Sequence, residues 1–130
     1  MTAAGRGGVI TLASTSAFQP TPGLSTYAAS KAFVLSLSEA LAVETRGTGV
    51  TITAVAPGTV ATDFFANAGA TFEVGGMLTA EVVVRDALRG YARGDSLVVP
   101  GLRNRLGTIG PRLLPRRVMA RAAGWAARAR

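Results

Sequence analysis

The chain has 130 residues, 48% of them hydrophobic, so it can bury one core of its own and forms one domain at most. It contains neither cysteine nor histidine, which excludes disulfides and thiolate metal sites and disfavours metalloenzymes and histidine-dependent hydrolases. The net charge of +7 comes from the end of the chain: residues 103–130 hold eight arginines and no acid, whereas residues 1–102 hold six basic and seven acidic residues.

The first predicted element is a short strand that ends in a hydroxyl group. Gly8–Ser14 reads G-V-I-T-L-A-S. This apolar run is a predicted strand, and it places Ser14 at the carboxyl edge of a sheet. Ligands of open α/β sheets bind at that edge. Gln19–Gly23, rich in proline and glycine, follows as a loop.

A helix is predicted from Tyr27 to about Arg46, with Thr26 as its cap. Phe33, Leu37 and Leu41 recur on one side as an apolar stripe. Glycines 47 and 49 end the helix.

Tyr27 and Lys31 stand one turn apart in this helix, and Lys31 is the only lysine of the chain. Residues at this spacing share a helix face. A cation beside a phenol favours the ionised form, so the pair can act as a proton donor and acceptor for a carbonyl or alcohol oxygen. A solvated surface pair is the alternative, and it is the commoner one when such a pair stands alone.

Two further strands and one helix are predicted. The β-branched run Val50–Val55 is a strand that turns at Pro57-Gly58, and Ser96–Val99 is another. Between them, Thr79 caps a helix that reaches Arg93. Strands alternating with helices indicate a parallel sheet with right-handed crossovers.

The tail from Pro115 to Arg130 is predicted to be a basic amphipathic helix. Its apolar side holds Val118, Ala122, Trp125 and Ala129, and arginines lie beside that side. Two interpretations stay open: a solvated helix docked on its own domain, which is favoured because alanines bury little area, or contact with an anionic membrane surface. Nucleic-acid binding is disfavoured, since base-reading motifs are lacking.

Taken together, these residues resemble the short-chain dehydrogenase/reductase family. The matching parts are Ser14 at the end of a strand, Tyr27 thirteen residues later, Lys31 in Y-x-x-x-K, a strand, and then P-G-x-x-x-T from Pro57 to Thr62. The joint spacing is far more specific than any one element. The resemblance runs from about residue 8 to residue 100.

The resemblance implies an α/β fold: the C-terminal half of a Rossmann-like, doubly wound parallel sheet over residues 1–102, with three strands alternating with helices and the basic tail at 103–130. It implies an NAD(P)-dependent oxidoreductase, with NADP favoured over NAD and no metal. The implied catalytic residues are Ser14, Tyr27 and Lys31. The implied cofactor-binding residues are Tyr27, Lys31, Pro57, Gly58, Val60 and Thr62.

Substrate, assembly and location follow as expectations. Phenylalanines and glycines between Asp63 and Met77 favour a mobile lid over core filling, hence a hydrophobic carbonyl or alcohol substrate. In the family the helix of Tyr27 packs against a partner subunit, so a homo-oligomer and ordinary intramolecular packing both stay open. We expect a cytoplasmic bacterial protein, with peripheral membrane contact through the tail as the alternative.

The family's glycine-rich turn T-G-x-x-x-G-x-G does not occur in the sequence. We therefore expect an enzyme shortened at its N-terminal side, with an unpaired strand edge and weak cofactor affinity. The alternative is a non-catalytic fragment or pseudoenzyme that acts by binding a protein or a membrane surface.

Overall fold

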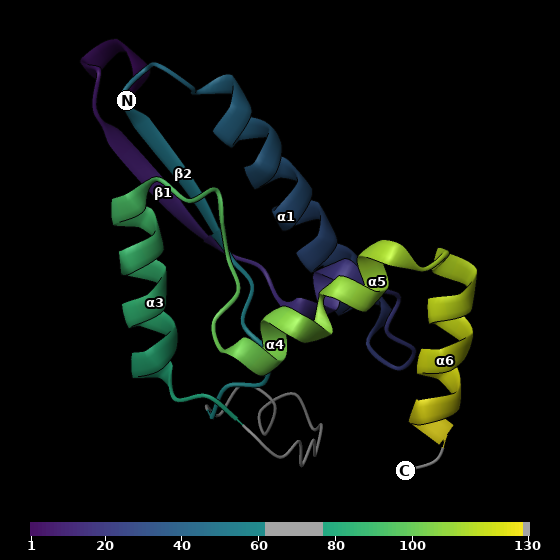
Figure 1. Cartoon of the computed structure of the whole chain (residues 1–130). Coiled ribbons are helices and arrows are strands. Elements are labelled where there is room, and N and C mark those ends of the chain that lie inside the picture. The colour runs from purple at the N-terminus through teal and green to yellow at the C-terminus, as the bar shows by residue number, and fades with distance from the viewer. Residues whose placement is uncertain (62–76, 129–130) are drawn as a thin grey trace.

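The computed structural model describes residues 1–61 and 77–128 of the chain (Figure 1). The elements in chain order are η1 (Thr2–Ala4), β1 (Gly7–Leu12), η2 (Thr15–Phe18), α1 (Ser25–Glu44), β2 (Val50–Val55), α3 (Ala80–Arg93), β3 (Leu97–Val98), α4 (Leu102–Gly107), α5 (Ile109–Leu113) and α6 (Arg116–Arg128), where η marks a 3-10 helix. Strands and helices alternate as the sequence predicts.

The three strands form one parallel sheet in the order β1-β2-β3. β1 and β2 pair along their full length, from Gly7 opposite Val50 to Leu12 opposite Val55. β3 is much shorter and pairs Leu97 with Ala54. The carboxyl ends of all three strands therefore lie at one edge, and the predicted α/β fold with a partial Rossmann-like sheet is confirmed.

Both faces of the sheet are covered, because successive side chains of β2 point to opposite sides. Ala54 packs in a buried cluster with Leu35 of α1, while Val55 packs with Val83 of α3. The two helices accordingly lie on opposite sides of the strands (Figure 1). Residues of β2 on both faces, from Ile52 to Val55, are therefore buried, as is usual in a parallel sheet covered on both sides.

The helix boundaries agree only in part with the prediction. α3 is preceded by Thr79 and ends at Gly94 in the left-handed conformation, as expected. A hydrogen bond from the Thr79 side chain lowers the pKa of the exposed Glu81 carboxyl in the first turn. Thr26 as the cap of α1 is wrong, because the helix begins at Ser25, after a turn in which Gly23 has a φ of +84°.

The region after β3 contains two short helices that the sequence did not predict. Gly101 precedes α4 and Thr108 separates it from α5. Gly107, Gly110 and Pro111 interrupt the apolar periodicity from which such helices are predicted. α6 then extends along one end of the molecule, away from the sheet (Figure 1).

Apolar side chains of β1 and α1 are left exposed. Among the described strands, none pairs with the outer edge of β1, and Leu12 at its end is 60% exposed. On α1 two of the three residues of the predicted stripe face outward: Phe33 is 67% exposed and Leu37 is also exposed, whereas Leu41 is half-buried. α1 packs on the sheet through Leu35, and its outward side leaves both a partner subunit and intramolecular packing open.

Gly90 tests the packing of α3 on the sheet. A Cβ there would collide with Cγ2 of Val98 in β3, so we expect Gly90→Ala to lower the free energy of unfolding by about 1–2 kcal/mol, even though alanine is the better helix former. Urea denaturation measures the change. Gly124→Ala in α6, whose Cβ would lie 3.9 Å from Pro22 Cγ, is the matched control and should be neutral or stabilising. Equal stability of the two variants would contradict this packing.

Candidate active site

A cavity of about 310 Å³ opens at the carboxyl ends of β1 and β2. Its lining residues are Leu12, Ala13, Tyr27, Lys31, Pro57, Gly58, Val60, Ala80, Val83 and Val84. Most of these side chains are apolar, and the polar groups come from Tyr27 and Lys31 on one wall. This is the edge at which open α/β sheets bind their ligands.

Tyr27 and Lys31 lie together on this wall because both belong to the first two turns of α1. The Lys31 Nζ atom is 5.6 Å from the centre of the Tyr27 ring, a distance at which the ammonium interacts with the aromatic ring. The Tyr27 side chain is half-buried. The predicted pairing of these two residues in one cavity is therefore present in the structure.

Lys31 is fixed by the strand beside it. Its Nζ donates a hydrogen bond of 2.8 Å to the carbonyl oxygen of Leu12, the last residue of β1. An ammonium group carries three hydrogens, so this bond leaves two for a ligand or water. The lysine can thus hold its position and still bind a hydroxyl group.

Ser14 lies next to the cavity but is not one of its lining residues. It is buried, and its Oγ accepts a hydrogen bond of 3.1 Å from the backbone N–H of Ser16 at the start of η2. Because Oγ is the acceptor in this bond, its own hydrogen can still donate to another oxygen. The backbone is held by a bond of 2.9 Å from Thr15 N to the carbonyl of Pro57, which ties the two loops after β1 and β2 together.

Pro57, Gly58 and Val60 form the second wall. A backbone bridge pairs Val60 with Leu78, using the carbonyl of Thr59 and the N–H of Ala61. Since successive backbone groups of an extended segment point in opposite directions, the N–H and C=O of Val60 point away from Leu78. The backbone groups of Val60, a residue that the family resemblance assigns to the cofactor, are therefore not used in this bridge.

Thr62 lies outside the described residues, and so does the predicted lid up to residue 76. The bridge between Val60 and Leu78 joins the two ends of that segment.

Sequence reasoning missed the wall formed by α3 and the neighbour of Gly58. Ala80, Val83 and Val84 line the cavity from α3. The side-chain amide of Asn104 in α4 lies where a Cβ of Gly58 would be, and its Nδ2 donates to the Pro100 carbonyl at 2.9 Å. In the sequence, only the spacing of apolar residues in α3 indicates that one side of this helix faces the interior. No local pattern marks Asn104 as a neighbour of Gly58.

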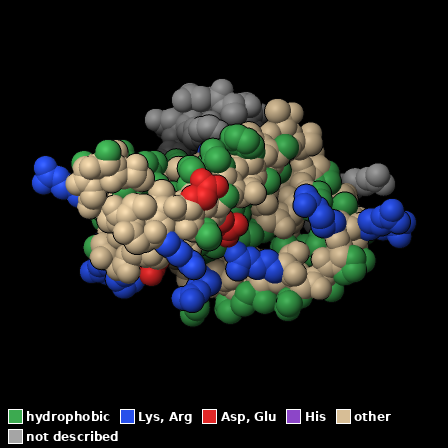
Figure 2. All heavy atoms as spheres, turned by 90° about the horizontal axis from the view of Figure 1, so that it is seen from above, with side chains coloured by type: hydrophobic (Ala, Val, Ile, Leu, Met, Phe, Trp, Pro, Cys, Tyr) green, Lys and Arg blue, Asp and Glu red, His purple; other side chains and the backbone are tan. Residues whose placement is uncertain are grey.

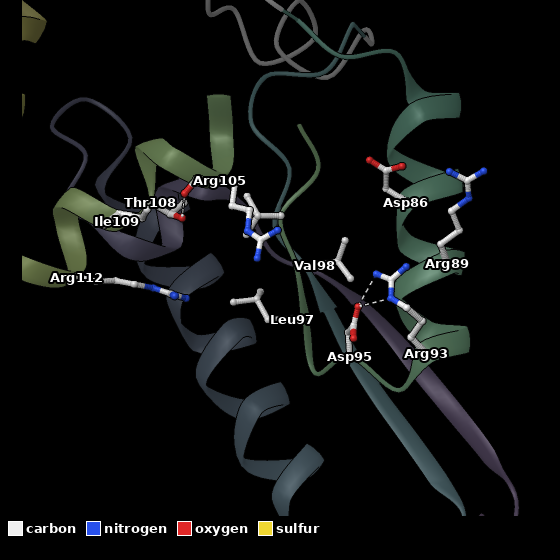
Figure 3. A pocket seen from close by; sticks show the side chains of 11 residues that line it. Asp86, Arg89, Arg93, Asp95, Leu97, Val98, Arg105, Thr108, Ile109 and Arg112 are labelled. Carbon is white, nitrogen blue, oxygen red and sulfur yellow. Dashed lines mark hydrogen bonds and ion pairs between the residues drawn. The ribbon is translucent and has the colours of Figure 1, made fainter. Parts of the chain in front are cut away.

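A larger pocket of about 470 Å³ lies elsewhere, between α3, β3, α4 and α5. Arg93, Arg105 and Arg112 point toward its interior, and Arg93 is paired with Asp95 at 2.6 Å (Figure 3). It contains none of the predicted site residues. Its charged groups are guanidinium and carboxylate groups, and a guanidinium does not exchange protons near neutral pH, so the smaller cavity is the better candidate for proton-transfer chemistry.

The comparison with known proteins agrees with this geometry. Residues 1–72 match the family model described as short chain dehydrogenase. The chain belongs to the short-chain dehydrogenase family. The matched residues include the strand of Ser14, all of α1 and the loop after β2.

Individual members of the short-chain dehydrogenase family are similar over parts of their length. An NADPH-dependent aldehyde reductase-like protein of Arabidopsis thaliana is 46% identical over 61 residues, covering 47% of this chain and 23% of the relative. A short-chain dehydrogenase from Sphingobium yanoikuyae solved with NADPH superposes with a TM-score of 0.73 at 30% identity, covering 84% of this chain and 44% of that one.

A 7beta-hydroxysteroid dehydrogenase structure gives a TM-score of 0.78 at 28% identity, with 94% of this chain and 49% of that chain covered. The chain therefore spans less than half the length of each of these three proteins.

Gly58 and Asn104 provide a test of the cavity wall. We expect Gly58→Ala to lower the free energy of unfolding by about 1–3 kcal/mol, because its Cβ would collide with the Asn104 amide. In the double variant with Asn104→Ala the cost should be smaller than the sum of the two single costs. Denaturation of the four proteins in urea measures the coupling. Strict additivity would show that the two residues do not meet.

Proposed function

We propose that this chain carries the catalytic half of an NAD(P)-dependent oxidoreductase that interconverts a carbonyl compound and its alcohol. The observation that carries the proposal is the position of Tyr27 and Lys31, side by side on one wall of an apolar cavity at the carboxyl edge of the sheet. A phenol placed there can exchange a proton with a substrate oxygen. The apolar walls reduce the competition from water.

Each residue has a separate task. In the reducing direction Tyr27 gives its hydroxyl proton to the substrate oxygen, and in the oxidising direction it takes that proton back. The ammonium of Lys31 lies beside the Tyr27 ring and binds a hydroxyl of the cofactor ribose with the hydrogens that the Leu12 carbonyl leaves over. On the family resemblance we assign Ser14 a hydrogen bond to the same substrate oxygen; its buried hydroxyl is outside the cavity lining, so it must turn toward the substrate to donate.

The residues of the cavity fit the nicotinamide and ribose part of the cofactor. Gly58 and the backbone of Val60 offer a wall without bulky polar side chains, and Lys31 has hydrogens left for ribose hydroxyls. When bound, the nicotinamide ring supplies or accepts the hydride. Pro57 belongs to the same wall, and Thr62, outside the described residues, stays a proposed cofactor-binding residue. NADP is favoured over NAD because the relatives from Arabidopsis and Sphingobium are named with NADPH.

The substrate is best described as a hydrophobic carbonyl or alcohol compound. The cavity supports this class, since Leu12, Val83 and Val84 line it with apolar side chains. The names of two similar proteins, an aldehyde reductase-like protein and a hydroxysteroid dehydrogenase, fall in the same class.

Tyr27→Phe is the central test. It should reduce carbonyl reduction at least about 10²-fold, the usual contribution of a general acid, while NADPH binding, followed by the cofactor's fluorescence, changes little. Turnover is measured on the full-length product of the reading frame. Tyr91→Phe is the matched control, because Tyr91 is the only other tyrosine and lies beside Gly8 at the amino end of β1.

Retention of the wild-type rate in Tyr27→Phe would contradict the assignment. A wild-type protein that neither binds NADPH nor turns over would contradict the oxidoreductase and favour a non-catalytic, binding role.

We also propose that the outward stripe of α1 contacts a second copy of the chain. Phe33 and Leu37 are exposed, and burying such side chains is favourable by about 1.5–3 kcal/mol each. Leu37→Glu should therefore shift the protein toward monomer in sedimentation velocity. An unchanged sedimentation coefficient would exclude this face. A cytoplasmic location in a bacterium completes the proposal.

A further inference from the structure

The last helix, α6, leaves its apolar side outside. Val118 is 48% and Trp125 76% exposed, and Ala122 between them is exposed as well. Arg117 and Arg121 are exposed on the adjoining side of the helix. We call these five residues the α6 stripe.

α6 does lie against its own domain, but through its other side. Met119, Ala120, Ala123 and Gly124 are the half-buried residues of the helix. Gly124 faces Pro22 in the loop before α1, where an added Cβ would be 3.9 Å from the proline ring. The small residues therefore make the intramolecular contact, and the stripe of Val118 and Trp125 is free for another surface.

Charge and exposed leucines extend this surface along α4 and α5. Residues 96–130 contain eight arginines and no acidic residue. Leu106 and Leu113 are exposed on the two short helices, Leu113 to 78%. Seen from above, apolar side chains line one rim of the molecule with arginine or lysine side chains beside them (Figure 2).

We infer that the α6 stripe docks on the surface of an anionic lipid bilayer. Exposed apolar side chains next to guanidinium groups are the combination that an interfacial helix needs, the first entering the headgroup region and the second meeting lipid phosphates. Tryptophan is favoured at that depth because its ring is apolar and its N–H polar.

The helix lies on the bilayer and does not cross it. Among residues 1–61 and 77–128, none of the helices has both the length and the apolar character of a bilayer-spanning segment. Val118 and Trp125 contribute most of the apolar area, with only an alanine between them, so the binding is reversible and depends on charge. Nucleic acid would satisfy the arginines but leave Val118 and the leucines exposed, so it fits the surface less well.

The test uses Trp125, the only tryptophan of the chain, as an internal probe. Vesicles of phosphatidylglycerol and phosphatidylcholine should shift its fluorescence to the blue and raise its intensity, and vesicles of phosphatidylcholine alone should not. Raising the salt concentration to about 1 M, where the Debye length falls to about 3 Å, should reverse the shift. Co-sedimentation with the vesicles gives the partition coefficient independently.

Arg117→Gln combined with Arg121→Gln should lower that partition coefficient about 30-fold, since each basic residue near an anionic surface contributes a factor of about five. The matched control is Arg46→Gln combined with Arg89→Gln, the same loss of charge on exposed residues of other parts of the molecule. The control should keep most of the binding. Circular dichroism checks that both double variants keep their helices.

Three outcomes would overturn the inference. One is a Trp125 spectrum that no vesicle changes. Another is equal loss of binding in the two double variants, which would mean that only net charge matters. The third is a blue shift that grows with protein concentration in the absence of vesicles, which would assign the stripe to a second copy of the chain. None of these outcomes bears on turnover, so the proposed function is tested separately.

Discussion

The hydrogen bond from Lys31 to the carbonyl of Leu12 connects the fold to the candidate chemistry. In a parallel sheet successive residues direct their backbone groups to alternate sides. The N–H of Ala13 bonds to Val55 in β2, so the carbonyl of Leu12 points to the open edge of β1, where Lys31 meets it. The Lys31 amine thereby satisfies the last carbonyl of β1, connects the second turn of α1 to that strand and lies beside the ring of Tyr27.

Small residues at the strand ends make room for the cavity. Ala13 follows β1, and Ala56 with Pro57 and Gly58 follows β2. Large side chains at these places would fill the space between α1 and α3, because both helices already pack closely on the two faces of β2. The same close packing makes Gly90 necessary, since α3 touches β3 there.

The sequence predicted those features that depend on local patterns. The β-branched run of β2, the Thr79 and Gly94 boundaries of α3, and the one-turn spacing of Tyr27 and Lys31 are all local, and the structure contains each of them. The start of α1 was wrong because the turn at Gly23, not the hydroxyl of Thr26, decides where the helix begins.

Features formed between distant segments could not be predicted from local patterns. The wall of Val83 and Val84 comes from a helix about fifty residues after Tyr27, and only the packing of α3 brings it to the cavity. Asn104 reaches Gly58 from a short helix that glycines on both sides obscure. The direction of an apolar stripe is also a tertiary property: periodicity identified the stripes of α1 and α6 but could not show that both face outward.

The outward surfaces differ in charge, and this difference separates their partners. Phe33 and Leu37 on α1 have acidic neighbours at Glu39 and Glu44 in the same helix, which an anionic bilayer would repel, so a protein surface suits them. Trp125 on α6 has only arginines for charged neighbours, and these would repel a second copy of the same basic helix. Both surfaces can bury apolar side chains on binding, and the charged residues around each surface determine which kind of partner it suits.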